Sequence, residues 1–295
     1  MKNKTTFHAT LALTKAFRLP EVLLMTGFFM IGGAFSIDHF SRLVLIQLSI
    51  IFGSIFFLIV SIYSFNAFSG FRKDLHNPRL KNLKHLSPLS YLIIAMISLM
   101  AALGLAAWFG RLIPTMIMLI CLLWMIYSNP RIGLKHVPFA GTALHFLAQI
   151  LHFNLVYFIF KSPGIESLLI SLFFACSFSA GHVHHEIIDY EADRNTSVRT
   201  GASVLGFRNA GYLSYGLFLA GFLIWILLFG LNMISLQTLL IWLPGIVPIS
   251  LAFLLLRKKM TIQHPARLMY RTTYRVVFLV CGIIYMLLKH LPGLI

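Results

Sequence analysis

The chain has 295 residues, of which 59% are hydrophobic and only 11% are charged, and its mean hydropathy is +0.86. Soluble domains carry about 25% charged residues, so the composition excludes an ordinary soluble protein and favours an integral membrane protein. The formal net charge of +16 does not indicate nucleic-acid binding, because the basic residues stand between long apolar runs rather than on one soluble face.

Residues 1–19 are basic, and their short apolar stretch is interrupted by Thr and Lys. No small-residue cleavage site follows closely, so the segment lacks the pattern of a cleaved signal peptide. We interpret it as a partly amphipathic interfacial helix on the cytoplasmic face of the membrane.

Apolar segments long enough to cross a membrane follow in series, since a span takes about 20 helical residues at 1.5 Å rise each. They are continuous and rich in Leu, Ile and Phe, whereas spanning β-strands would be shorter and would alternate. The sequence therefore predicts an all-α, polytopic membrane protein with nine transmembrane helices. The predicted spans are 20–37, 43–65, 89–109, 112–128, 138–160, 164–183, 210–231, 235–256 and 272–290.

The basic residues predict the orientation of these helices. Of the 24 Lys and Arg residues, all but Arg42, Arg111, Lys161 and Lys289 fall on the side of the N-terminus. This strong positive-inside bias predicts an N-in, C-out topology. We expect one domain, residues 1–295, whose helices surround a central apolar chamber beneath a polar cap that faces the cytoplasm.

Half of the eight acidic residues fall within positions 186–193. Asp189 and Asp193 are spaced i,i+4, which places them on one helical face about 6 Å apart. Two such carboxylates repel each other and favour a bound cation. Mg²⁺ is suited to them, because it takes oxygen ligands and is often held by carboxylates together with substrate phosphates. Arg194 and Arg199 follow and can meet phosphate oxygens. The alternative is a solvated cytoplasmic segment with balanced charge.

Two further polar stretches follow the second and fourth predicted spans. In the first, Asn66, Gly70 and Asp74 share a helical face at i, i+4 and i+8. Its alternative interpretation is the ordinary end of a spanning helix with topogenic charge. The cations beside it are Arg72, Lys73 and Arg79.

The other stretch, YSNPRIGLKHVP, begins with Tyr127 at a helix end and is interrupted by Pro130. Arg131 and Lys135 lie on the predicted inner face, and the alternative is a turn with topogenic charge. All three stretches belong to that same face. Together they predict a cytoplasm-facing site in which Mg²⁺, carboxylates, an amide and cations hold a diphosphate, while the apolar bundle takes a hydrocarbon tail.

Histidines near the acidic stretch allow a second interpretation. His182, His185 and Glu186 lie on one predicted helical face with Asp189, so a metal site made by them is the alternative interpretation. A di-metal bundle would need matching Glu-x-x-His elements on other helices, and the sequence contains no second one. Interfacial hydrogen bonding is the favoured interpretation. Two more histidines, His145 and His152, either pack in the fifth span, which is favoured, or line the chamber and contact the acceptor.

The stretch DYEADRNTSVRTGASVLG, at 189–206, resembles the DxxxD motif and tail of the UbiA superfamily of intramembrane prenyltransferases. YSNPRIGLK, at 127–135, resembles the family's Tyr-Ser-x-Pro segment with its downstream Lys. FRLPEVLLMTGFFMIGGAF, at 17–35, resembles the family's opening Arg-Pro, although Leu19 separates the two residues here. The family's first motif, NxxxDxxxD, is matched by Asn66 and Asp74, but Gly70 stands in place of its first Asp.

The resemblance implies Mg²⁺-dependent transfer of a polyprenyl group from an allylic prenyl diphosphate to a lipophilic acceptor. That acceptor would be a phenolic ring, a quinone precursor, a tetrapyrrole or a glycerol lipid. Beyond these substrates and membrane lipid we expect no nucleic acid and no obligatory protein partner. The implied metal ligands are Asn66, Asp74, Asp189 and Asp193, the three aspartates being catalytic. The implied diphosphate ligands are Asn66, Arg72, Tyr127, Arg131, Lys135 and Arg194.

Three alternatives stand beside transfer. A terpene cyclase of the same fold would capture the allylic cation within its own chain. A degenerate, non-catalytic homologue would explain Gly70. A transporter would place ionisable residues near the bilayer midplane, whereas the acidic residues here cluster at one end of the predicted spans.

Overall fold

The computed structural model describes residues 18–74, 86–129, 137–195, 199–245 and 265–290, with residues 132, 134, 247, 250 and 254. The described residues are mostly helical and contain no strand, which confirms the all-α prediction. The chain divides into two compact units. Unit 1 comprises residues 1–30 and 40–133, and unit 2 comprises residues 31–39 and 134–295.

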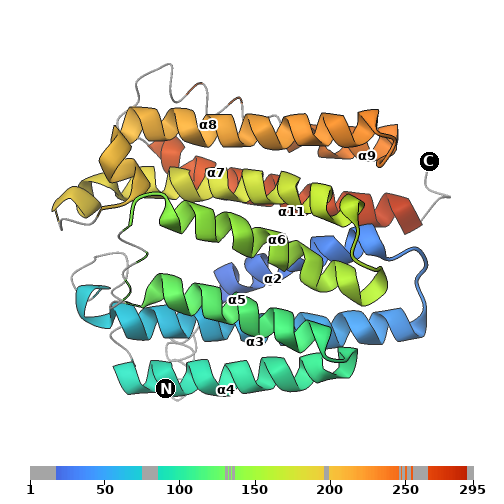
Figure 1. The fold of residues 1–295 in the computed structure, drawn as a ribbon, viewed down its shortest axis with the longest axis horizontal. Coiled ribbons are helices and arrows are strands. Elements are labelled where there is room, and N and C mark those ends of the chain that lie inside the picture. Colours follow the sequence, from blue (N-terminus) through green and yellow to red (C-terminus); the bar gives the residue numbers. More distant parts are fainter. Residues whose placement is uncertain are drawn as a thin grey trace, which may run out of the picture. The chain divides into compact units, whose positions relative to one another are not determined.

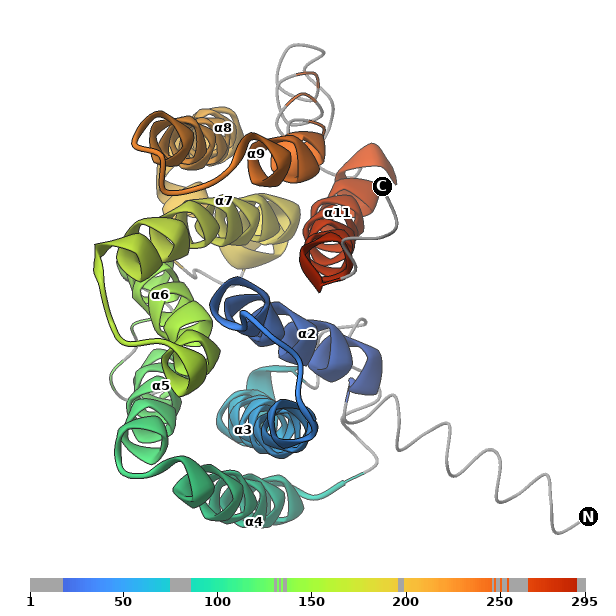
Figure 2. The same ribbon diagram turned by 90° about the vertical axis from the view of Figure 1, so that its right-hand side faces the viewer.

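Unit 1 consists of the first part of one helix and three whole helices. α3, α4 and α5 pack side by side in Figures 1 and 2. α4 has Pro88 at its first position and is capped by Ser87, whose side chain accepts a hydrogen bond from the Ser90 N–H. The helices are α2 (Leu19–Ser36, to Met30 in this unit), α3 (Arg42–Asp74), α4 (Pro88–Ala106) with the 3₁₀ turn η2 (Ala107–Phe109), and α5 (Leu112–Ser128).

Serine hydroxyls join α3 to α4. Ser54 Oγ donates to the Ala102 carbonyl oxygen at 2.8 Å, and Ser61 Oγ donates to that of Ala95 at the same distance. Both alanines are buried, and their small side chains allow the two backbones to approach. Small residues and hydroxyls are what helices use to associate where no water is present.

One face of α4 is apolar and exposed. Met96, Ile97 and Met100 are 62%, 65% and 70% exposed, and Leu89 and Ile93 extend the same apolar face. An apolar surface of this extent is unfavourable in water. It fits a helix that faces lipid.

Unit 2 contains the end of α2 and the remaining described helices. α7 packs against α6 on one side and against α8 and α11 on the others, as Figure 2 shows. The helices are α6 (Ala140–Phe160), α7 (Ile165–Asn195), α8 (Gly201–Gly230), α9 (Leu236–Trp242) with the 3₁₀ turn η4 (Leu243–Gly245), and α11 (Pro265–His290).

Aromatic rings fill the core of unit 2. The Phe35 ring, at the end of α2, stacks on Tyr285 of α11 with centroids 4.5 Å apart and meets Trp225 of α8 edge-on at 6.0 Å. Offset and edge-to-face pairs of this kind add to the stabilisation from burial. The other rings of the cluster are Phe153, Phe173, Phe174, Trp242 and Phe278.

Small residues again set the helix spacing in unit 2. Ser214 Oγ of α8 donates to the Ala180 carbonyl oxygen of α7 at 2.8 Å. A Cβ added to Gly32 of α2 would overlap the carbonyl oxygen of Phe153 in α6. The backbones of α2 and α6 therefore touch at a position where only glycine fits.

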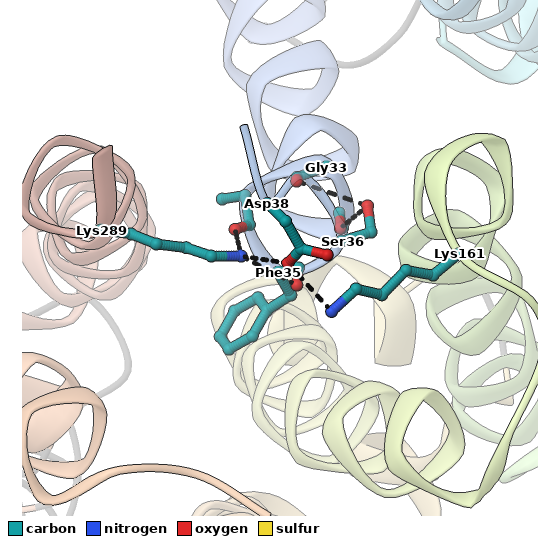
Figure 3. A network of polar contacts seen from close by, with 8 residues as sticks. Gly33, Phe35, Ser36, Asp38, Lys161 and Lys289 are labelled. Carbon is teal, nitrogen blue, oxygen red and sulfur yellow. Dashed lines mark hydrogen bonds and ion pairs between the residues drawn. The ribbon is translucent and has the colours of Figure 1, made fainter. Parts of the chain in front are cut away.

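Charged side chains form a network at one end of unit 2 (Figure 3). Lys289 of α11 donates to the carbonyl oxygens of Ala34 and Phe35, at 3.4 and 3.3 Å, in the last turn of α2. Asp38 Oδ1 lies 3.6 Å from Lys289 Nζ and 3.2 Å from Lys161 Nζ at the end of α6. Three helix ends are thus joined through one carboxylate.

Several helices extend beyond the apolar segments that predict them. α3 continues past residue 65 to Asp74, and α7 past residue 183 to Asn195. The extension of α7 over 182–195 contains neither Gly nor Pro, which favours a continuous helix, whereas the extension of α3 stays helical through Gly70. α8 begins at Gly201, nine residues before the predicted span.

The span count and orientation stay predictions. Six of the described helices are long and apolar enough to cross a membrane, and α5 is a shorter apolar helix. α9 ends at Trp242, where Leu-Pro-Gly follows, and much of the remaining predicted span to residue 256 lies outside the described residues. The predicted interfacial helix at 1–19 also lies almost wholly outside them.

We expect Gly32→Ala to lower the free energy of unfolding by about 1–3 kcal/mol, because its methyl group overpacks the contact between α2 and α6. Gly216→Ala on α8 is the control, since an added Cβ there meets nothing within 4 Å. It should be neutral or stabilising by up to about 1 kcal/mol. Thermal unfolding in detergent measures both, and equal stability of the two variants would contradict the close approach.

The Asp38 network predicts a pH-dependent contribution to stability. Its slight burial raises the pKa of Asp38, but the hydrogen bonds and charges of Lys161 and Lys289 outweigh this and leave the pKa below its ordinary value. A depressed carboxyl pKa stabilises the fold above the unfolded pKa, about 3.9, and this contribution is lost as pH falls through the folded pKa.

Wild type should therefore exceed Asp38→Asn in melting temperature at pH 7, by a margin that shrinks below about pH 4. Melting curves between pH 7 and pH 3 test this. In a Lys161→Met, Lys289→Met background the Asp38→Asn difference should lose its pH dependence. A margin that is constant with pH in the wild-type background would refute the electrostatic role of Asp38.

Candidate functional site

The acidic stretch lies on the polar extension of α7. Because this helix runs unbroken to Asn195, Asp189 and Asp193 share one helical face, as their spacing predicts. Ile187, two residues before Asp189, is fully buried. It anchors the extension in a cluster with Val183 and with Ala202 of α8. Asp189 is 36% exposed and Asp193 is half-buried, so both carboxylates are held in place yet reach solvent.

Two carboxylates of α7 fix the start of α8. Thr200 caps α8 by accepting from the Ser203 N–H at 3.2 Å, and its hydroxyl donates to Asp193 Oδ2 at 3.2 Å. Glu186 Oε2 accepts from the Ala202 N–H at 3.1 Å. The first turn of a helix carries partial positive charge, which favours both anions. Half of the four clustered acids therefore hold α8 in position.

Histidines accompany the other oxygens of the cluster. His182 Nε2 lies 3.4 Å from Glu186 Oε1, and His185 Nδ1 lies 3.4 Å from Asp189 Oδ2. The His182 ring stacks on His145 of α6, with centroids 4.6 Å apart. These contacts place the histidines beside the carboxylates, and the hydrogen-bonding role that the sequence favours over a di-metal centre stays a prediction.

The donor set of Asp189 and Asp193 fits Mg²⁺ rather than a softer metal, because it consists of carboxylate oxygens that solvent and phosphate can share. Two carboxylates alone are an incomplete shell. Among the residues described, no group of three or more His, Cys, Asp or Glu is placed to hold a metal ion. The further ligands predicted, Asn66 and Asp74, belong to unit 1, and a site shared with them stays a prediction.

The first motif occupies the last turns of α3. Asn66 and Gly70 lie on its helical face, as predicted, and the helix ends at Asp74. The Ser69 hydroxyl donates to the Asn66 carbonyl oxygen at 3.1 Å. The side chains of Arg72 and Asp74 lie outside the part of the chain that the structure describes.

Of the other predicted diphosphate ligands, the structure describes Tyr127 and Arg194. Tyr127 is in the last turn of α5 and meets the Trp124 ring edge-on at 5.7 Å. Arg194 is exposed in the last turn of α7, with its guanidinium 6.0 Å from the Tyr190 ring centroid. Arg131 and Lys135 lie outside the described residues.

Sequence reasoning missed the roles of Glu186 and Thr200. Thr200 had a local signal, because Thr is a common N-cap residue that accepts from the N–H three residues on, but the predicted span began only at residue 210. Glu186 had none, since the N–H that it accepts from lies 16 residues further along the chain.

A family model identifies the chain. The model of the UbiA prenyltransferase family matches residues 22–287. The chain belongs to the UbiA prenyltransferase family. That range includes both acidic motifs and covers most of both structural units.

Solved structures share the fold of this UbiA-family chain. A UbiA homologue from Archaeoglobus fulgidus bound to GPP and Mg²⁺ has a TM-score of 0.71 and 15% identity, over 93% of this chain and 99% of that one. A structure of digeranylgeranylglyceryl phosphate synthase has a TM-score of 0.69 and 14% identity, over 95% and 98%. The apo UbiA homologue from Aeropyrum pernix K1 has 0.68 and 14%, over 90% and 97%. No curated protein matches the chain.

The cap of α8 predicts an energetic coupling between Thr200 and Asp193. Thr200→Ala should cost about 1–2 kcal/mol of stability through loss of the cap. Ser235→Ala is the matched control, because Ser235 caps α9 in the same way by accepting from the Thr238 N–H. Asp193→Asn should be additive with Ser235→Ala but not with Thr200→Ala. Denaturant unfolding of the single and double variants measures this, and additivity in both pairs would contradict the hydrogen bond.

Proposed function

We propose that this protein is a Mg²⁺-dependent prenyltransferase that moves a polyprenyl group from an allylic prenyl diphosphate to a lipophilic acceptor. The observation that carries the proposal is the half-buried pair Asp189 and Asp193, held on one face of α7 in a chain of the UbiA prenyltransferase family. The homologue from Archaeoglobus fulgidus binds GPP and DMAPP with Mg²⁺, which supports the same ligand class here.

The metal would be held by Asp189 and Asp193 together with Asp74 and the amide oxygen of Asn66. When bound, Mg²⁺ neutralises the charge of the diphosphate and stabilises it as a leaving group. Phosphates and waters would complete the shell, in which Gly70 supplies no carboxylate.

Cations and one phenol would bind the diphosphate oxygens that the metal does not take. Arg194 is exposed at the end of α7, next to the acidic pair. Guanidinium groups bind phosphate in a bidentate manner, and this gives orientation as well as charge. The other proposed ligands are Arg72, Tyr127, Arg131 and Lys135.

The allylic carbon becomes positively charged as its bond to the diphosphate breaks. An apolar, water-poor chamber would keep water from capturing that cation, and aromatic faces stabilise it. A carbon or oxygen of the acceptor then supplies the electron pair of the new bond. The site is proposed to face the cytoplasm, which the positive-inside distribution of Lys and Arg supports.

Purified protein in detergent should release diphosphate from geranyl diphosphate only when Mg²⁺ is present, and should melt at a higher temperature with both ligands than with either alone. Asp189→Asn and Asp193→Asn should each lower the rate by about 10²-fold or more. Glu191→Gln is the matched control, because it removes one charge from the exposed side of the same helix. Loss of activity in the control to the same degree, or release without Mg²⁺, would refute the metal role of the pair.

Gly70 supports one second candidate, a non-catalytic homologue. Gly70→Asp separates the two. A large gain of diphosphate release by a silent protein would identify a degenerate site, whereas loss of an existing activity would show that Gly70 belongs to a working one. Product formed without an acceptor would instead identify a cyclase.

A further inference from the structure

A stripe of exposed residues runs along α8 on the side opposite to α7. α8 packs against α7 and α9 (Figure 2), and its Ala210 and Ser214 contact α7. At about 3.6 residues per turn, the positions on the opposite face are exposed, and α8 is long and apolar enough to cross a membrane. We call these positions the lipid stripe: Arg208, Tyr212, Leu219, Leu223 and Ile226.

The polar residues of the lipid stripe lie at one end of it. Arg208 comes two residues before the predicted span 210–231, and Tyr212 follows one turn later. A guanidinium stays protonated and is costly in hydrocarbon, so its side chain extends toward the headgroups. Tyr is enriched at the same depth, because its ring is apolar and its hydroxyl is polar. This end of the stripe therefore fits the boundary between hydrocarbon and headgroups.

The two polar side chains of the stripe contact each other. The guanidinium carbon of Arg208 lies over the Tyr212 ring, 5.9 Å from the ring centroid. The ring face attracts the cation and orients it without neutralising it. The acidic stretch belongs to α7, which packs on the opposite face of α8. The described contact of Arg208 is thus with a ring and not with a carboxylate, and its full charge is available at the membrane surface.

These features together select a phosphate that is attached to acyl chains. A guanidinium binds two phosphate oxygens through parallel hydrogen bonds, and the hydroxyl of Tyr212 is a further donor. Val204 and Phe207, beside Arg208, are large exposed apolar residues, and the rest of the lipid stripe is apolar. A lipid buries its acyl chains against such a surface, whereas a soluble phosphate does not. The charge of Arg208 favours a headgroup with net negative charge.

We propose that Arg208 and Tyr212 form a binding site for the phosphate of an anionic phospholipid, whose acyl chains lie along the lipid stripe of α8. This inference goes beyond the proposed function, and it does not require the protein to be catalytic.

The test uses the purified full chain in neutral detergent, with increasing amounts of dioleoyl phosphatidylglycerol or dioleoyl phosphatidylcholine. A ligand of the folded state raises the melting temperature by mass action, so wild type should respond at a lower fraction of the glycerol lipid than of the choline lipid. Arg208→Gln should need about 5-fold more of the glycerol lipid for the same rise, and Tyr212→Leu should weaken the response in the same direction. Without lipid, Arg208→Gln should melt like wild type.

Arg199→Gln is the matched control, because it removes the same charge from an exposed position that precedes α8. It should respond to the glycerol lipid like wild type. An equal loss of response in this control would show general attraction between charges and refute the site. So would an equal response of wild type to both lipids.

Two further outcomes would overturn the inference. If Arg208→Gln melts lower than wild type without lipid and keeps the full response to the glycerol lipid, Arg208 has a structural role only. If inorganic phosphate stabilises wild type as strongly as the glycerol lipid does, and this effect is lost in Arg208→Gln, the site binds a soluble anion and not a lipid.

Discussion

The absence of hydrogen-bonding solvent around the helices is the constraint from which this structure follows. In hydrocarbon each helix satisfies its own backbone, so small residues that let helices touch and hydroxyls that reach a carbonyl become important for joining them. Ser54, Ser61 and Ser214 each donate to the carbonyl of a buried alanine in the neighbouring helix. Gly32 serves the same end without a hydrogen bond.

The acidic cluster shows how one short stretch serves both structure and chemistry. Glu186 and Asp193 hold the first turn of α8, through Ala202 and Thr200. Asp189 and Asp193 supply the oxygen pair that suits a hard cation. Because Asp193 belongs to both sets, the position of the proposed metal ligand is tied to the helix that follows it. The density of carboxylates in this stretch reflects that double use.

Sequence reasoning succeeded where one physical signal dominates. Apolar runs predicted the helices, and the i,i+4 spacing predicted that Asp189 and Asp193 share a face. The predicted helix ends were wrong, because hydropathy indicates where the membrane ends and not where the backbone hydrogen bonds of a helix end. α7, for example, continues to Asn195, past its predicted end at residue 183. Sequence reasoning could not foresee the stacking of His145 on His182, which depends on how α6 and α7 are packed.

Gly206 interrupts α8 at φ 77° and ψ 152°, a backbone conformation that only glycine adopts easily. An added Cβ would meet nothing within 4 Å there, so the residue is required by torsion and not by crowding. The five residues before it consequently take a direction that differs from that of the long membrane segment behind them. Gly206 therefore lets one helix present its first turn to the carboxylates of α7 while its longer part keeps the direction of a membrane span.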